Sequence, residues 1–428
     1  EAALVPHLPA ALLRAPAGTS KLKWNFELLG AAVGDEDFTD QHTASRVRAA
    51  APLVEALAEL EDAQVGLRLL RSCAGHCRLV HGSRCAPPSG QRSALQHFDS
   101  LVRDCFSGLT GLHLNGWQWE QAGRGLAYAG LGLRSVASDG AAAYLASLGG
   151  CLEACRAIDP HYAAAGLATE PSVVAAAAGL PQPLAPHLAL AMKQKALTKA
   201  ADEAGWQRLS RARAFLAAVP VGRKRMDTAA FVAELRQRLH VPDSSQDTWC
   251  PRCNGILDSH SLHAGTCIAG GERTMRHNAA RDLVCWWADK AGLNPEKEKP
   301  GLLLPQRPED AGQAGRRPAD IYLPSLSGFP AALDLAITAP QRPESLAQAS
   351  QSALAAASAY KLANHLGTAQ ACQEQGAVPA SCSGSHWCVG GLSCQRPAAD
   401  CEGGCGSHTR RGIASACRDA PGTARVSP

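Results

Sequence analysis

Apolar residues recur at helical spacing through most of the first 240 residues. The stretch ASRVRAAAPLVEALAELEDAQVGLRLLRSC, residues 44–73, keeps this spacing over many turns. The pattern continues in residues 140–155 and 174–205, with interruptions at GLP and PLAP, where proline and glycine break helices. We therefore expect residues 1–240 to form a mostly α-helical domain.

The pattern changes after a polar segment, PDSSQDT at 242–248. GERTMRHNAARDLVCWWADKAG predicts one helix that ends at Gly292. Three short apolar runs, PGLLLP, RPADIYLP and PAALDLAIT, predict strands, and an Ala-rich helix is expected over 343–367. The order helix, strand, strand, strand, helix predicts a small α/β domain over 271–379.

The remaining residues, 380–428, hold several cysteines but no sustained periodicity. A disulfide-linked module is one alternative, but a disordered or aberrant Cys-rich tail fits the composition better. Together these patterns predict a multidomain chain with a mostly α N-terminal region, a small cysteine-rich motif, an α/β domain and a disordered tail.

Composition and charge limit the classes of function only loosely. Hydrophobic residues make up 46% of the chain, enough for packed cores, and the net charge is +4. No apolar run is long enough to predict a membrane span. The chain begins at Glu1 instead of Met, so we expect a fragment of a longer protein.

The most basic surface is expected over 206–240, where eight Lys and Arg stand against two acidic residues. It includes Arg223, Lys224 and Arg225. Such a segment fits either a nucleic-acid contact or a solvated helix face.

A candidate metal site follows the polar segment. Cys250 and Cys253 have the CxxC spacing of a zinc knuckle, and His263 and Cys267 lie about one helical turn apart. Thiolates and imidazole are ligands that suit zinc, and four protein ligands leave no open position for catalysis. The sequence therefore predicts a structural zinc knuckle at 245–270, with His260 as an alternative to His263.

Carboxylates form a second candidate site. Asp320 and Asp334 each lie in an apolar, strand-like run, with turn residues between them, and Glu298 lies just upstream. Adjacent strands could bring the two aspartates to one Mg²⁺, which prefers oxygen ligands. Lys361 on the following helix, together with Arg316 and Arg317, could contact a phosphate. The plain alternative is that both aspartates are solvated at strand ends.

These motifs together resemble the C-terminal end of reverse transcriptases from non-LTR retrotransposons. The resemblance rests on C-x2-C…H-x3-C, RTMRHNAARDLV, RRPADIYL, ALDLAIT and AYK, and it is most specific over 245–365. That lineage carries a zinc knuckle and a restriction-endonuclease-like domain of the PD-(D/E)XK fold. FELLGAAVGDEDF and GLGLRSVASDG resemble the helical region that follows the polymerase palm. The palm itself and its Tyr-x-Asp-Asp motif are absent from this sequence, so no polymerase activity is expected.

The resemblance implies roles for individual residues. Asp320 and Asp334 would bind Mg²⁺, Lys361 would be the catalytic lysine and Glu298 the upstream acid. A nucleic-acid contact or a role in helix packing is implied for Arg276 and His277, and Arg273 nearby is a further candidate for nucleic-acid contact. The expected partners are a DNA target and the retroelement RNA, in the nucleus, without a membrane or a small-molecule substrate.

The sequence also departs from the family motif in two places. Ala336 stands where the motif has its lysine, and an alanine, Ala319, lies between the proline and Asp320. Three hypotheses follow: an endonuclease that nicks DNA to prime reverse transcription, an inactive module that binds zinc and nucleic acid, and a decayed reading frame.

Overall fold

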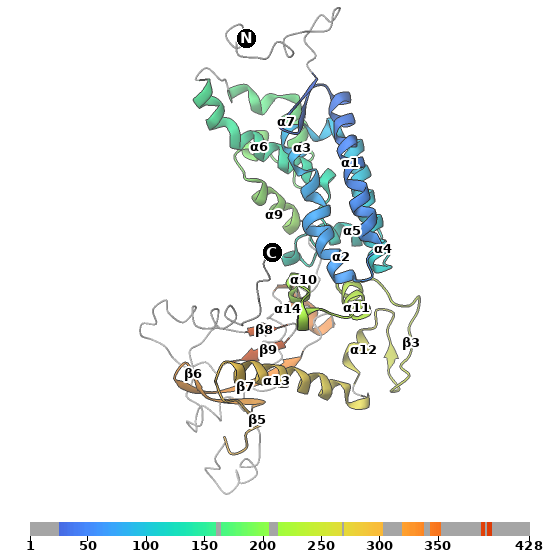
Figure 1. Cartoon of the computed structure of the whole chain (residues 1–428), viewed down its shortest axis with the longest axis vertical. Helices are drawn as coiled ribbons and strands as arrows, with labels where there is room; N and C mark the ends of the chain where they lie inside the picture. Colours follow the sequence, from blue (N-terminus) through green and yellow to red (C-terminus); the bar gives the residue numbers. More distant parts are fainter. Residues whose placement is uncertain are drawn as a thin grey trace, which may run out of the picture. The chain divides into compact units, whose positions relative to one another are not determined.

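The computed structural model describes residues 25–159, 164–204, 213–267, 269–302, 319–337, 343–351, 387–389 and 392–395 (Figure 1). The described part of the chain is mostly helical, with small antiparallel sheets. It divides into two compact units, residues 1–245 and 246–428, and the division falls inside the polar segment 242–248.

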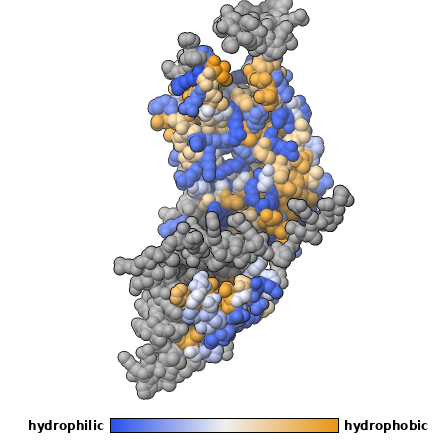
Figure 2. All heavy atoms as spheres, turned by 60° about the vertical axis from the view of Figure 1, so that its left-hand side comes forward, coloured by the Kyte–Doolittle hydropathy of each residue, from blue (hydrophilic) through white to orange (hydrophobic). Residues whose placement is uncertain are grey.

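The N-terminal unit begins with a short antiparallel hairpin of β1 (Phe26–Leu28) and β2 (Ala31–Val33). Its helices are α1 (Glu36–Ala58), α2 (Ala63–Leu69), α3 (Val80–Cys85), α4 (Arg92–Thr110), α5 (Gly116–Gly123), α6 (Val136–Ile158), α7 (Pro171–Ala178), α8 (Pro186–Leu190), α9 (Gln194–Ala204), α10 (Ala214–Ala217) and α11 (Thr228–Arg238). On the face drawn in Figure 2, hydrophilic and hydrophobic residues are intermixed over this unit.

The apolar pattern over 44–73 does not form one continuous helix. α1 ends at Ala58, and Asp62 starts α2 by accepting a hydrogen bond from the backbone N–H of Val65. Such an N-cap satisfies a donor that the first helical turn leaves unpaired. The chain therefore turns at a capping aspartate although the apolar spacing runs across it.

Two apolar cores stabilise this unit. The larger one is built around α1, α2, α4 and α11 and buries Phe98, Phe106 and Phe231 almost completely. The smaller one packs α6 against α7, α8 and α9, with Leu145 and Val173 fully buried.

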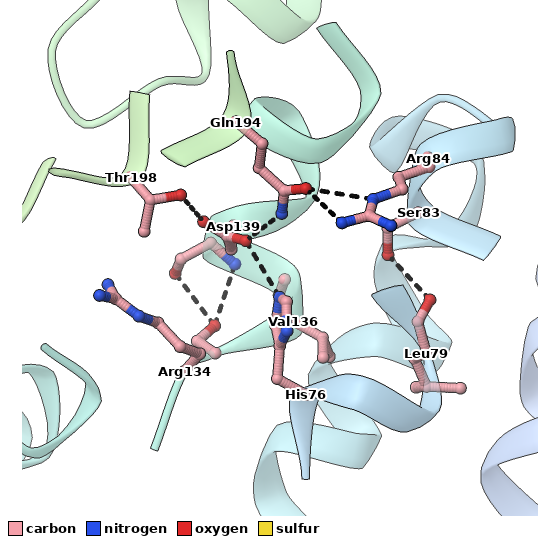
Figure 3. Close-up of polar contacts among 12 residues, drawn as sticks. His76, Leu79, Ser83, Arg84, Arg134, Val136, Asp139, Gln194 and Thr198 are labelled. Carbon is pink, nitrogen blue, oxygen red and sulfur yellow. Dashed lines mark hydrogen bonds and ion pairs between the residues drawn. The ribbon is translucent and has the colours of Figure 1, made fainter. Parts of the chain in front are cut away.

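A polar network lies beside the smaller core (Figure 3). The Asp139 carboxylate on α6 accepts hydrogen bonds from the Thr198 hydroxyl at 2.7 Å and the Gln194 amide at 2.9 Å, and it lies 3.0 Å from Nε2 of His76. The Gln194 carbonyl oxygen in turn accepts from the guanidinium of Arg84. Asp139 therefore ties α9 and the segment before α3 to α6.

The C-terminal unit contains β3 (Thr248–Trp249), β4 (Ile256–Leu257), α12 (Leu262–Thr266), α13 (Glu272–Lys290), β5 (Glu296–Lys297), β6 (Ile321–Leu326), β7 (Phe329–Ile337), α14 (Pro343–Gln351), β8 (Trp387–Val389) and β9 (Leu392–Gln395). β3 and β4 form a hairpin, and the other five strands form one antiparallel sheet in the order β5-β6-β7-β9-β8. α13 ends as predicted, with Gly292 at a φ of 71° just beyond it.

Two expectations about this unit need correction. The first strand of the sheet is Glu296–Lys297, upstream of the apolar run that predicted it, and residues 303–305 of that run lie outside the described part. The segment 380–428, expected to lack regular structure, contributes β8 and β9, and β9 pairs with β7. Pairing with β9 satisfies backbone groups that β7 would otherwise leave open at a sheet edge.

The turn of the β6–β7 hairpin sets which residues of the two strands pair with each other. This turn consists of Ser327 and Gly328, both at positive φ, as a two-residue type I′ turn requires. The strands therefore run closer to the turn than the proline and serine residues suggested, and the register shifts between Leu323 and Leu326. Beyond that irregularity Ile321 pairs with Leu333.

One face of this sheet is apolar and packs on α13, which runs alongside β6 and β7 in Figure 1. The buried residues are Ile321, Leu323, Ala331, Leu333 and Leu335 from the strands, with Cys285 and Ala288 from the helix. Because side chains alternate along a strand, Tyr322 and Asp334 are assigned to the opposite face. Asp320 precedes β6, and its carboxylate lies beside His277 of α13.

Candidate metal centre and acidic site

The four predicted zinc ligands converge on one point. The ligand atoms of Cys250, Cys253, His263 and Cys267 all lie within 4.8 Å of one another. The Sγ atoms of Cys250 and Cys267 are 3.9 Å apart, and those of Cys253 and Cys267 are 3.8 Å apart. In a tetrahedral site with Zn–S distances of about 2.3 Å, two sulfurs are separated by about 3.8 Å, whereas a disulfide requires about 2.05 Å. This Cys/His cluster could hold a metal ion and fits a structural zinc site.

The geometry also favours one of the two histidines. Nε2 of His263 lies 3.2 Å from the Cys253 sulfur, whereas Nδ1 of His260 lies 3.2 Å from the Ser259 hydroxyl. Asp258 orients the start of α12 because its carboxylate accepts hydrogen bonds from the backbone N–H groups of His260, Leu262 and His263.

The thiols of the cluster differ in acidity. The backbone N–H of Arg252 lowers the pKa of Cys250 to about 6. The N–H of Gly255 acts in the same direction on Cys253, but burial and the neighbouring thiols raise the pKa of Cys253 above its ordinary value. Three adjacent sulfurs resist full ionisation when no cation is present, and zinc binding requires thiolates.

A second cluster is a row of three carboxylic acids, which we call the acidic row: Glu298 just after β5, Asp320 just before β6, and Asp334 within β7. Glu296 pairs with Tyr322, so the same register sets Glu298 opposite Asp320, and the backbone N–H of Glu298 donates to the Asp320 carbonyl at 2.9 Å. The pairing of Ile321 with Leu333 likewise sets Asp320 opposite Asp334. Residues directly opposite one another have Cβ atoms about 4.5–5.5 Å apart.

The acidic row is electrostatically strained. Burial raises the pKa of Asp320, and the carboxyl of Asp334 raises it further. The opposing influences are the backbone N–H of Leu335, which donates to Oδ2 of Asp320 at 2.5 Å, and the nearby His277. Glu298 has a φ of 45°, a conformation that L-residues rarely adopt. Like charges on neighbouring strands destabilise a sheet, and a proton, a basic side chain or a metal cation would relieve this repulsion.

Helix α13 supplies two basic side chains, His277 and Arg281, to the row. Nε2 of His277 lies 3.3 Å from Oδ2 of Asp320, and Arg281 forms an ion pair with Glu298. The two residues are one turn apart and continue the stripe that buries Cys285 and Ala288 against the sheet. The apolar packing of α13 on the sheet therefore also places His277 next to Asp320 and Arg281 next to Glu298.

Arg281 was missed from the sequence, and His277 was assigned to nucleic acid or to packing. The spacing of residues 277, 281, 285 and 288 on one helix face was the available signal. Arg281 is only 12% exposed, as expected for a residue on the inward stripe.

The other predicted basic residues have varied surroundings. Arg273 and Arg276 are exposed on α13, and Lys224 is exposed in the N-terminal unit. Arg225 is also exposed but pairs with Asp62 at 2.8 Å. Arg238, which belongs to the same basic segment, is buried, bonds the carbonyls of Leu126 and Gly130, and has its pKa lowered by burial to about 10. The basic segment is therefore only partly a free surface.

Several predicted site residues lie outside the described part of the chain. They are Lys361, Arg316, Arg317 and the side chains of Arg223 and Ala336. Within the described residues, the structure brings together the four cluster ligands and, separately, Glu298, Asp320 and Asp334.

No family model, curated protein or solved structure matches this chain. Within the described ranges, no helix combines the length and the apolar character that crossing a bilayer demands.

Proposed function

We propose that the C-terminal unit is a metal-dependent DNA endonuclease module of a retroelement-derived protein, with the PD-(D/E)XK architecture and a structural zinc knuckle. The observation that carries the proposal is the acidic row. Asp320, just before β6, and Asp334, within β7, occupy opposed positions in the strand register. Two carboxylates opposed in the register give a sheet no stability by themselves, and a shared cation would offset their repulsion.

The residues of the row fit a divalent oxygen-binding cation such as Mg²⁺. Asp320 and Asp334 would hold it, and a bound Mg²⁺ supplies charge neutralisation at a phosphodiester and a more acidic water. His277 and the N–H of Leu335 fix the direction of the Asp320 carboxylate. Arg281 holds the Glu298 carboxylate at the edge of the site, next to Asp320 in the register.

The zinc proposal follows from the Cys/His cluster. With four protein ligands the metal would have no free position, so its contribution is to the folding of a short segment with little apolar core. The knuckle is followed directly by α13, whose exposed Arg273 and Arg276 are proposed contacts for nucleic acid. A DNA target, the retroelement RNA and a nuclear location remain part of this proposal.

A plasmid-nicking assay tests the function. The whole, zinc-loaded chain is incubated with supercoiled DNA in Mg²⁺ or in EDTA, beside the double variant Asp320→Asn/Asp334→Asn. Nicking that requires Mg²⁺ and is lost in the variant supports the endonuclease. Asn keeps the size of the side chain, and a matching circular dichroism spectrum shows that the variant is folded.

The second candidate is a module that binds zinc and nucleic acid without cleaving. Ala336, at the lysine position of the nuclease motif, favours it. Salt-dependent DNA binding by a folded chain that never nicks would establish this candidate and exclude the first.

A further inference from the structure

We propose that one side of helix α13 binds single-stranded nucleic acid, with Trp287 as the surface on which an unpaired base stacks. This inference rests on the proposed function for the kind of partner and adds the form of that partner. Five residues form this side, which we call the outer stripe: Arg276, Ala280, Leu283, Trp287 and Lys290. At about 3.6 residues per turn they share one side of the helix, distinct from the stripe that packs on the sheet.

The outer stripe carries apolar surface that the core does not use. Trp287 is 48% exposed, and Ala280 and Leu283 are half-buried. α13 already packs Cys285 and Ala288 against the sheet, on its other stripe. A helix that buries one apolar stripe is expected to be polar on its remaining surface, so an exposed indole there points to a partner.

Neighbouring side chains hold the Trp287 ring in place. The rings of Trp286 and Trp287 meet edge to face, with their centroids 4.8 Å apart. Nζ of Lys290 lies 6.0 Å from the centroid of the Trp286 ring, which places a cation beside the two indoles. A ring that is already fixed loses little conformational entropy when a base stacks on it.

The basic residues of the C-terminal unit divide into paired and unpaired groups. Four Lys and Arg side chains form ion pairs with carboxylates of the described part of the chain: Arg252, Arg281, Lys297 and Lys299. Arg273, Arg276 and Lys290 form no ion pair with any described residue, and all three are exposed on α13. Positive charge that the described carboxylates do not neutralise is therefore concentrated on this helix.

The acidic residues of α13 leave the outer stripe positive. Arg252 engages Glu272 at 2.8 Å, and Lys297 engages Asp282 at 2.8 Å. Asp289 is exposed, but it is two residues from Trp287 and therefore lies on the other side of the helix. A surface with a cation at each end and an indole between them complements a chain of phosphates that carries planar bases.

The indole favours a single strand over a duplex. In a duplex the faces of each base are covered by the neighbouring bases, whereas the bases of a single strand can separate and stack on aromatic side chains. Arg276 and Lys290 are about 21 Å apart along the helix axis, so the stripe is long enough for several nucleotides. Single-stranded DNA and RNA share this chemistry, and the test below separates them.

The test measures binding by full-length, zinc-loaded chains without Mg²⁺, so that cleavage does not interfere. The probes are fluorescein-labelled oligo(dT), oligo(rU) and a DNA duplex, all of equal length. The chains are the unaltered protein, Trp287→Ala, Trp287→Phe, Lys290→Met and Trp117→Ala. Trp117 is the matched control because it is 43% exposed and lies on α5, in the other unit. Zinc content and circular dichroism verify that each chain is folded.

We expect Trp287→Ala to weaken the binding of a single strand by about tenfold, the effect of losing one stacked base. Trp287→Phe should keep most of the affinity, because a phenyl ring still stacks. Lys290→Met should reduce the slope of log affinity against log salt by about 0.7, as for one phosphate contact on a single strand. Duplex binding should not change in Trp287→Ala, and Trp117→Ala should match the unaltered chain with all three probes. The polymer that loses more affinity in Trp287→Ala, DNA or RNA, is the one that the stripe binds.

Equal affinity of Trp287→Ala and the unaltered chain for both single strands overturns the inference, and so does an equal loss of duplex binding. Plasmid nicking by the unaltered chain separates this inference from the proposed function. A chain that nicks, with single-strand binding that Trp287→Ala leaves unchanged, keeps the endonuclease and loses the outer stripe. A chain that never nicks, with single-strand binding that Trp287→Ala weakens, keeps the outer stripe and loses the endonuclease.

Discussion

Gly255 lies against the imidazole of His263: a Cβ atom on residue 255 would come within 2.8 Å of ring carbon Cε1 and 3.2 Å of the Cys253 sulfur. The knuckle turn therefore needs a residue without a side chain at this point. The backbone N–H of Gly255 also donates to the Cys253 sulfur at 3.3 Å, so the turn and the ligand support each other.

The first prediction concerns this glycine. Gly255→Ala should displace His263 and weaken zinc binding by at least tenfold, which corresponds to about 1.4 kcal/mol. Competition with a chromophoric zinc chelator measures the affinity. Gly265→Ala is the matched control, since a Cβ atom there would meet nothing within 4 Å. Equal affinities for the two variants would contradict the assignment of His263 as a ligand.

Removal of zinc should unfold the knuckle and leave the helical unit folded. A structural zinc site contributes folding free energy directly, and here few buried apolar residues support the segment 246–267. Differential scanning calorimetry with and without a strong chelator should show two transitions. The chelator should lower the temperature of the transition that includes the knuckle and leave that of the helical unit unchanged. Because thiolates must form for zinc to bind, the metal should also be released as the pH is lowered. Joint loss of both transitions would show that the units do not unfold separately.

The next two predictions concern the acidic row. Asp320 has a pKa raised above the ordinary value of 3.8, so the folded state holds a proton more tightly than the unfolded chain. Its charge therefore costs stability as the pH rises from about 3.8 through the raised pKa. At neutral pH Asp334→Asn should stabilise the C-terminal unit by about 0.2–1 kcal/mol, by removing the opposed like charge.

The thermal transition temperature of the same variant should no longer rise when Mg²⁺ is added. Binding to the folded state alone raises the transition temperature of the unaltered chain as Mg²⁺ is added. Asp334→Asn removes one of the two proposed ligands, so its transition should stay constant over the same concentrations. A variant that is less stable without Mg²⁺ would show that the two carboxylates do not repel each other.

Arg281 should matter for stability as well as for the site. Its side chain is 12% exposed and pairs with Glu298 and Asp282. Arg281→Met keeps the aliphatic length but leaves Glu298 without this partner, and we expect a loss of about 1–3 kcal/mol. Arg276→Met, on the exposed face of the same helix, should change stability by less than about 0.5 kcal/mol. Chemical denaturation of both variants makes the comparison.

The polar network of the helical unit predicts sensitivity to acid. Burial acts to raise the pKa of Asp139, but the hydrogen bonds from His76, Thr198 and Gln194 and the charge of His76 together bring it below the ordinary value of 3.8. The stability that this carboxylate contributes is therefore complete above about pH 3.8 and is lost as the pH falls through the lowered pKa.

Asp139→Asn should accordingly destabilise the helical unit at neutral pH, by about 1–3 kcal/mol. The difference from the unaltered chain should shrink in strong acid. Glu55→Gln, an exposed change in the last turn of α1, should show no such dependence. A difference that grows as the pH falls would mean that Asp139 is not held as a carboxylate.

Local signals in the sequence predicted individual helices and strands better than they predicted the contacts between them. α13 was predicted with its end because a helical period is followed by Gly292, and both signals lie within the helix itself. β5 was missed because Glu296 and Lys297 are charged, and only the hydrogen bonds to β6 make them a strand. The break at Asp62 was hidden for the opposite reason, because apolar spacing continues across it.

In the candidate site, too, local features were predictable from the sequence, whereas contacts between distant segments were not. The spacing of the cysteines identified the Cys/His cluster, because a knuckle is a local structure. The pairing of Asp320 with Asp334 was expected from the hairpin, but the contacts of His277 and Arg281 with the acids depend on how α13 packs on the sheet. Those contacts join residues far apart in the chain and leave little trace in local pattern.

The two-residue turn at Ser327 and Gly328 sets the strand register that brings Asp334 opposite Asp320. If one residue were inserted into that turn and the pairing slipped by one position, a leucine, Leu333 or Leu335, would take the place of Asp334 opposite Asp320. Selection for the carboxylate pair would therefore act on the length of a loop that touches no ligand. Shifts of the reading frame or single-codon insertions there would remove the site as completely as loss of the aspartate itself.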